Sequence, residues 1–170
     1  MGSAALVNGT LLRGKHYLSG NLGGHMTLNF KGRPCNCGSI GCVETEASTW
    51  ALPQIAKQHI NFEKSSLSNK ELNYKVLFKE AEKDPVAAEL LDHCLNAWAF
   101  GVLNLVHAFD PEKVVISGGI MASGDKIIKR IEMVLDEYSW LPKGATIVEK
   151  AQHPNEAALL GMEYLCLHNI

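Results

Sequence analysis

The sequence has no excess of charge of either sign. Its 170 residues carry 16 lysines and arginines against 18 aspartates and glutamates, for a net charge of −2. Nucleic acids and anionic membrane surfaces bind proteins through concentrated positive charge, which this composition does not supply. We therefore expect neither a nucleic-acid partner nor a membrane partner.

Long hydrophobic runs are missing as well. A bilayer-spanning helix needs about 20 consecutive apolar residues, and a signal peptide needs a basic stretch followed by an apolar block. Neither pattern occurs, so a cytoplasmic location is expected. The hydrophobic share of 46% is still enough to bury the core of one compact domain, or of a large piece of a two-domain protein.

Paired cysteines are not evident either. There are five cysteines, an odd number, and three of them lie between positions 35 and 42. The other two, Cys94 and Cys166, lie in apolar, helix-like stretches where a free thiol behaves as a small hydrophobic group. This distribution argues for a bound metal rather than for disulfide bonds.

The candidate metal ligands are His25, Cys35, Cys37 and Cys42. One imidazole and three thiolates fill a tetrahedral zinc shell and leave no position open for water, which predicts a structural zinc ion. An ordinary iron–sulfur cluster would need a fourth cysteine nearby. The alternative is three unliganded thiols beside a hydrogen-bonded histidine, and the clustering favours the metal.

Turn residues and periodicity in the first half predict short elements. Two strands within residues 4–13 flank Asn8-Gly9, a dipeptide suited to a type I′ hairpin turn. Residues 14–24 contain four glycines and predict a loop whose backbone can approach a ligand closely. A strand is expected at 26–30, then a helix over 44–59 that Pro53 bends or divides. Residues 61–75 indicate a loop or a poorly packed helix.

The clearest element is a long helix from Asp84 to Phe109. Asp84 can cap it, a proline follows at the first helical position, and apolar residues recur every three or four positions. A strand at 113–117, helix 125–137, strand 146–150 and helix 155–168 come next. Strands that alternate with helices indicate an α/β fold with a partly parallel sheet.

The whole chain is interpreted as one domain, residues 1–170. It divides into a hairpin and glycine-rich loop (1–24), a zinc and sugar loop (25–44) and an α/β body (45–170). A strand begins almost at Met1, which is abrupt for a domain, so we expect further sequence upstream.

Three segments resemble the ROK family of repressors, open reading frames and kinases. GGHMTLNFKGRPCNCGSIGCVETEAS carries a glycine–histidine pair and a C-x-C-G-x-x-G-C-x-E block. VVISGGIMASGDKIIKRI resembles the family's second nucleotide-contacting turn, and NEAALLGMEYL its closing helix. The resemblance implies the C-terminal domain of an actin-like ATPase (ribonuclease H-like) fold with an inserted zinc loop, and hence a missing N-terminal half.

The resemblance implies one ligand class and two functions. ROK kinases phosphorylate hexoses or acetylamino sugars with ATP and magnesium, in a cleft between two domains. ROK repressors sense similar sugars and carry an N-terminal helix-turn-helix. Family proteins are often dimers or tetramers, so a homo-oligomer is expected. A third reading gives the zinc loop a role only in stability and oligomerisation.

The resemblance also implies which residues contact the sugar. His25 would bind zinc through one ring nitrogen and a sugar hydroxyl through the other, and Glu44 would accept hydrogen bonds from sugar hydroxyls. The alternative for Glu44 is a carboxylate stabilised at a helix N-terminus. Many ROK kinases have a glutamate where this chain has Leu22. Three alternatives follow: another residue, for which Asn21 is the candidate, replaces it, the preferred sugar differs, or sugar binding is weak.

The resemblance also implies that Gly118 and Gly119 bind the nucleotide. Their backbone, and the N-terminus of the helix that follows them, would approach the adenosine or its phosphates. A Gly-Gly turn on its own is more often ordinary punctuation. In ROK kinases the base comes from an Asn-Asp pair and the phosphate turn is Asp-x-Gly-Gly-Thr. Neither pattern is present, so no catalytic residue is assigned, ATP and magnesium are expected only for a full-length protein, and this chain alone should be inactive.

Overall fold

Helix α4 (Pro85–Phe109) is the longest described helix and forms the centre of the helical core. The computed structural model describes residues 1–154 and 156–167. The carboxylate of Asp84 accepts hydrogen bonds from two backbone N–H groups of the first turn of α4, and Pro85 occupies the first helical position. Asp110 ends the helix in a left-handed conformation. The predicted helix and both of its ends are confirmed.

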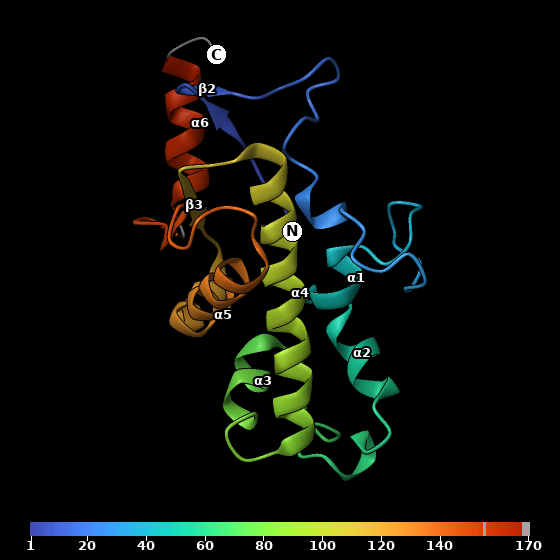
Figure 1. Ribbon diagram of the computed structural model, residues 1–170. Helices are drawn as coiled ribbons and strands as arrows, with labels where there is room; N and C mark the ends of the chain where they lie inside the picture. The colour runs from blue at the N-terminus through green and yellow to red at the C-terminus, as the bar shows by residue number, and fades with distance from the viewer. Residues whose placement is uncertain (155, 168–170) are drawn as a thin grey trace.

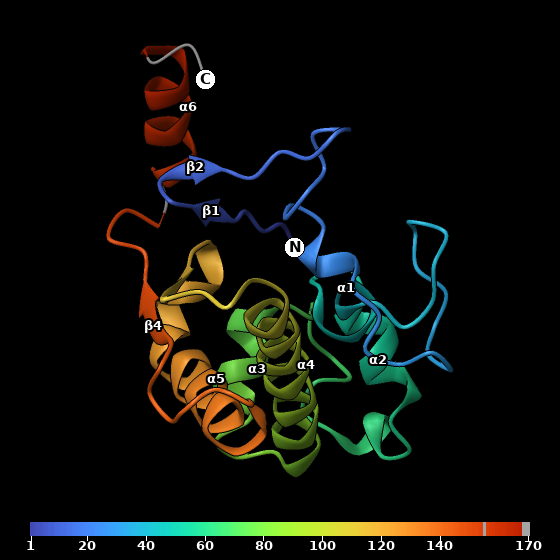
Figure 2. The ribbon, with the colours of Figure 1, turned by 45° about the horizontal axis from the view of Figure 1, so that its top comes forward.

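The helices lie on two sides of α4 (Figures 1 and 2). Helices α1 (Val43–Ala47) and α2 (Leu52–Gln58) cover one side, and α3 (Tyr74–Glu80) and α5 (Gly124–Tyr138) cover the other. Helix α1 comes so close to α4 that a Cβ atom at Gly101 would lie 3.1 Å from a methyl group of Val43. The hydrophobic core therefore forms between α4 and its neighbours.

The described strands form two separate two-stranded sheets. Strands β3 (Lys113–Ile116) and β4 (Ile147–Lys150) are parallel and α5 connects them. Strands β1 (Leu6–Val7) and β2 (Thr10–Leu11) form an antiparallel hairpin. The φ angles of Asn8 and Gly9 are +50° and +74°, and a type I′ turn requires both to be positive. The hairpin and the βαβ unit were both predicted correctly.

The predicted strand at 26–30 is wrong. In the described structure Thr27 makes only an isolated bridge, with Cys42. The N–H groups of Leu28 and Asn29 both donate to the carbonyl oxygen of Gly41, and Gly32 then donates to Asn29. The chain reverses direction after Asn29 and the cysteine loop packs against this segment, so no regular pairing between strands forms here.

The predicted helix over 44–59 is divided, but not at Pro53. Ser48 is extended, with a ψ angle of 163°, and so ends α1; Pro53 lies in the first turn of α2, where proline is well tolerated. The hydroxyl of Tyr74 and the indole N–H of Trp98 both donate to the carbonyl oxygen of Ala47, at 2.7 and 3.0 Å. Two side chains distant in sequence thus stabilise the break.

The remaining elements are shorter or lie at the end of the chain. Residues 61–75 contain the 3-10 helix η2 (Phe62–Lys64) and a loop, after which Asn73 caps α3. Helix α6 (Ala157–Leu167) corresponds to the predicted final helix, of which residues 155 and 168 lie outside the described residues. None of the described helices is long and apolar enough to cross a bilayer.

Candidate metal centre and sugar site

The four predicted metal ligands come together. Their ligand atoms all lie within 4.8 Å of one another. The Sγ atom of Cys35 lies 3.6 Å from Nδ1 of His25, and the Sγ atoms of Cys37 and Cys42 are 3.8 Å apart. A tetrahedral zinc ion with its usual bond lengths holds its ligand atoms about 3.5–3.8 Å apart. The donor set and its spacing therefore fit a zinc ion.

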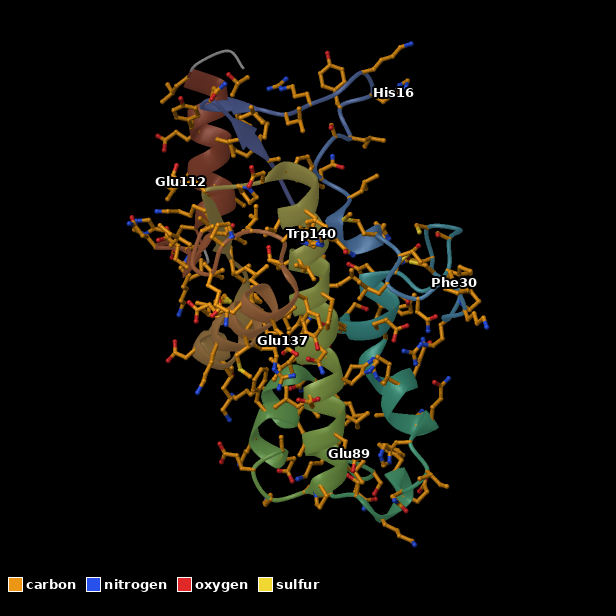
Figure 3. The ribbon with its side chains drawn as sticks, viewed as in Figure 1. His16, Phe30, Glu89, Glu112, Glu137 and Trp140 are labelled. Carbon is orange, nitrogen blue, oxygen red and sulfur yellow. The ribbon has the colours of Figure 1, made fainter. Side chains whose placement is uncertain are left out.

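Two turns bring the sulfur atoms together. The N–H of Cys35 donates to the carbonyl of Ser39, and Gly38 donates back to Cys35 with a φ angle of +90°, which favours glycine. At Gly41 the φ angle is +58°, and a Cβ atom there would collide with the carbonyl oxygen of Asn29. A residue larger than glycine therefore does not fit at position 41. The outer part of the loop extends into solvent, where Phe30 is exposed (Figure 3).

The thiols of the cluster differ in their electrostatics. Burial, with its neighbouring cysteines, raises the pKa of Cys42 to about 12. The pKa of the exposed Cys37 lies below its ordinary value, chiefly because a backbone hydrogen bond at Ser39 favours its thiolate. Without a cation Cys42 is a neutral thiol at pH 7. A metal ion would supply the positive charge that holds it as a thiolate.

A network of polar side chains ties the cysteine loop to the helices. Arg33 of the loop donates to Glu46 of α1 at 3.1 Å and to Gln58 of α2 at 2.9 Å. The same carboxylate oxygen of Glu46 lies 3.1 Å from Nε2 of His93 on α4. The loop is therefore fixed relative to α1, the short helix that carries Glu44 two residues after the last cysteine of the cluster, Cys42.

Glu44 is buried and both of its oxygens have partners. Its Oε2 accepts a hydrogen bond from the indole N–H of Trp50 at 3.0 Å, and its Oε1 is paired with the α-amino group of Met1. The cluster faces Nδ1 of His25, which leaves Nε2 as the ring nitrogen available to another ligand.

Asn21 lines a cavity to which neither His25 nor Glu44 contributes. Its Nδ2 donates to the carbonyl of Tyr17 at 3.2 Å, while its Oδ1 is buried and accepts no hydrogen bond within the described residues. It lines a cavity of about 250 Å³ with Arg13, Tyr17 and Ser19, among others. No hydrogen bond joins Asn21 to His25 or Glu44 in this part of the chain. Leu22 is about half exposed.

The Gly118–Gly119 turn lies beside a basic cavity. Gly118 follows β3 with a φ angle of +105°, and Gly119 begins the 3-10 helix η3 (Gly119–Ser123). This helix contributes Met121 and Ser123 to a cavity of about 590 Å³ between α3, α5 and the end of β4. The cavity also holds four lysines against two carboxylates; the lysines are Lys75, Lys79, Lys126 and Lys150.

The lysines were missed in the sequence, although Lys75 and Lys79 have the spacing of one helical face. That signal was hidden because residues 61–75 were interpreted as a loop or weak helix. Lys150 comes from the end of β4, more than 70 positions away in the chain. Only the tertiary structure brings these ammonium groups together.

The comparisons with known proteins decide the family. The ROK family model matches residues 1–169. The chain belongs to the ROK family. It is 32% identical over 174 residues to a glucokinase of Halalkalibacterium halodurans, which covers 97% of this chain and 52% of that protein. It is 25% identical to the xylose repressor of Caldicellulosiruptor bescii, over 95% of the chain and 42% of the repressor.

Solved structures agree with this membership. A ROK family glucokinase from Streptomyces griseus, whose structure holds glucose and AMPPNP, matches with a TM-score of 0.79 and 26% identity over 96% of this chain and 56% of that one. The mixed α/β content fits the actin-like ATPase fold of these kinases. The chain spans about half the length of the curated relatives it matches.

Proposed function

We propose that this chain is the zinc-containing, sugar-binding half of a ROK protein that phosphorylates a hexose or an N-acetylhexosamine with ATP and magnesium. The main support is that the His25, Cys35, Cys37 and Cys42 cluster immediately precedes α1 and that Nδ1 of His25 lies 3.6 Å from the Sγ atom of Cys35. The zinc ion would fix the tautomer of His25, so that Nε2 faces the sugar in one defined protonation state. Glu44 would accept hydrogen bonds from neighbouring hydroxyls.

The nucleotide would bind at the Gly118 turn with its phosphates toward the basic cavity. Among the described residues, Lys75, Lys79 and Lys150 have no carboxylate within salt-bridge distance, so their charges are available to an anion. Replacing Lys79 by Gln should weaken ATP binding several-fold in a fluorescence titration. Unchanged affinity would place the nucleotide elsewhere.

The catalytic base and the phosphate turn of ROK kinases are not in this sequence, so the chain's own contribution is binding and orientation. It would hold the sugar between His25 and Glu44 and hold the nucleotide at Gly118. Deprotonation of the attacking hydroxyl would come from the other half of the kinase.

Sugar binding is the direct test. Glu44→Gln should weaken the binding of glucose or N-acetylmannosamine at least tenfold by isothermal titration, because a charged acceptor of two hydroxyls is lost, while zinc content stays the same. Glu112→Gln, at an exposed carboxylate shown in Figure 3, is the matched control and should change neither quantity. If Glu44→Gln loses zinc and sugar together, its role is structural.

A second candidate is the sugar-sensing half of a ROK repressor, since the xylose repressor matches nearly the whole chain. Sensing needs the same sugar contacts but no base and no nucleotide. A full-length gene product that binds sugar and shows no sugar-dependent ADP formation would favour this candidate over the kinase.

A further inference from the structure

The cavity that Asn21 lines is separate from the proposed metal, sugar and nucleotide sites. Its volume is about 250 Å³, and His25, Glu44 and Gly118 do not line it. The loop that forms one wall follows β2 and extends away from the helices, with His16 at its outer turn (Figure 3). The lining mixes apolar and polar side chains; it consists of Ala4, Leu11, Leu12, Arg13, Tyr17, Ser19 and Asn21.

Backbone contacts fix the loop against the hairpin. The N–H of Leu12 donates to the carbonyl oxygen of Ala5 at 2.8 Å, and the N–H of Ser19 donates to that of Arg13 at 3.1 Å. Gly14 has a φ angle of +66°, and a Cβ atom there would lie 2.8 Å from Cβ of Ser19. The wall of the cavity is therefore formed before any ligand binds, as in most small-molecule sites.

Arg13 gives the cavity one positive charge. Its guanidinium carbon lies 6.0 Å from the centre of the Tyr17 ring, within the range of a cation–π contact. Among the described residues no carboxylate lies within salt-bridge distance of Arg13, and the lining contains no aspartate or glutamate. A guanidinium group can bind a carboxylate through two parallel N–H groups. The charge of Arg13 is therefore available to an organic anion.

Asn21 adds a hydrogen-bond acceptor that the fold does not use. Its Nδ2 donates to the carbonyl oxygen of Tyr17 at 3.2 Å, which fixes the orientation of the amide. Its Oδ1 is buried and accepts no hydrogen bond in the part of the chain that the structure describes. Buried polar atoms nearly always have a partner, so a donor on a bound ligand would complete this one.

We propose that this cavity binds a short-chain hydroxy carboxylate, with its carboxylate on Arg13 and its hydroxyl at Oδ1 of Asn21. Its apolar carbons would pack against Leu11 and Leu12. An amino acid fits less well, because the cavity contains no carboxylate to pair with an ammonium group. A sugar phosphate also fits less well, because several of its hydroxyls would face leucine and alanine side chains without a partner.

The test titrates the 170-residue chain with 2-hydroxyisocaproate by calorimetry and follows the side-chain amide of Asn21 by NMR. A Kd of about 1 mM or lower is expected, together with a shift of the Asn21 amide resonance. Isocaproate, which lacks the hydroxyl, and free leucine, which carries an ammonium group in its place, should each bind at least about fivefold more weakly. Inorganic phosphate that displaces the ligand at equal concentration would overturn the proposed ligand class.

Arg13→Gln should weaken binding at least about tenfold, because a charge-assisted pair is lost. Arg13→Lys keeps the charge without the two parallel N–H groups and should give an intermediate loss. Lys15→Gln is the matched control, since it removes the same charge from an exposed position of the same loop that does not line the cavity. It should leave the Kd unchanged.

Three results would overturn the proposal. The first is the absence of both heat and an Asn21 shift at about 10 mM ligand. The second is an unchanged Kd in Arg13→Gln. The third is an equal loss in Arg13→Gln and Lys15→Gln, which would show attraction to the net charge of the loop rather than to this cavity. None of these results bears on the proposed sugar site, which the Glu44→Gln variant tests separately.

Discussion

Glu44 is a buried carboxylate whose two oxygens have different partners. Trp50 holds Oε2 through a hydrogen bond, and the Met1 ammonium group pairs with Oε1. An indole bond of this kind fixes the plane of the carboxylate. In the proposed sugar site Oε1 would therefore be the oxygen that meets a sugar hydroxyl, and Trp50 would act as a positioning residue for it.

Replacing Trp50 by Phe should weaken sugar binding about tenfold, because one hydrogen bond to a charged group is lost while the ring volume is largely kept. Zinc content and the unfolding midpoint should change little. Trp140→Phe, at a tryptophan that is 95% exposed (Figure 3), is the control. Equal affinity of the Trp50 variant and the parent in calorimetry would remove Trp50 from the site.

The cysteines make the metal assignment testable one residue at a time. The chain purified without a chelating column should contain about one zinc equivalent, and Cys35→Ser should retain less than half of it, because a neutral hydroxyl replaces a thiolate ligand. Cys166→Ser, at an exposed cysteine outside the cluster, should keep the full amount. Elemental analysis that finds less than half an equivalent in the parent chain would refute the zinc site.

Two ionised carboxylates, Glu80 and Asp84, stabilise the connection between α3 and α4. Glu80 is buried beside Lys70, at 2.7 Å, and Ser66, and hydrogen bonding to Lys70 lowers its pKa to about 2. At Asp84, burial alone would raise the pKa, but hydrogen bonds from Ser65 and Ser66 outweigh it and hold the pKa well below its ordinary value.

The lowered pKa values of Glu80 and Asp84 predict how the stability of the chain depends on pH. Both groups have folded pKa values below their unfolded values, so their stabilisation is complete above about pH 4.5 and is lost as the pH falls toward 2. The urea midpoint of the chain, measured with a chelator so that no zinc is bound at any pH, should fall over that range. Glu80→Gln should lower the midpoint at pH 7 and flatten its decline below pH 4.5. A parallel decline in parent and variant would contradict this account.

The whole molecule should depend on its metal for stability. The cluster joins His25 to the cysteine loop that directly precedes α1. A ligand present at about a hundredfold excess over its Kd stabilises the folded state by about 2.7 kcal/mol. Removal of zinc should therefore lower Tm by about 5–10 °C in a chain of this size. Readdition of zinc, but not of magnesium, should restore Tm in a calorimetric scan.

The sequence alone determined the local features of this protein. Asn8-Gly9 predicted the hairpin, Asp84-Pro85 predicted the start of α4, and the cysteine spacing predicted the ligand cluster. Each depends on residues close together in the chain, where backbone preference and ligand spacing decide the outcome. The family resemblance rested on the same kind of local motif.

Only the tertiary structure decided the features made by contacts between distant residues. The break after Ala47 depends on Tyr74 and Trp98, and the basic cavity draws its lysines from three elements. Sequence spacing does not encode such contacts, because they form only when α1, α3 and the end of β4 pack around α4 and α5.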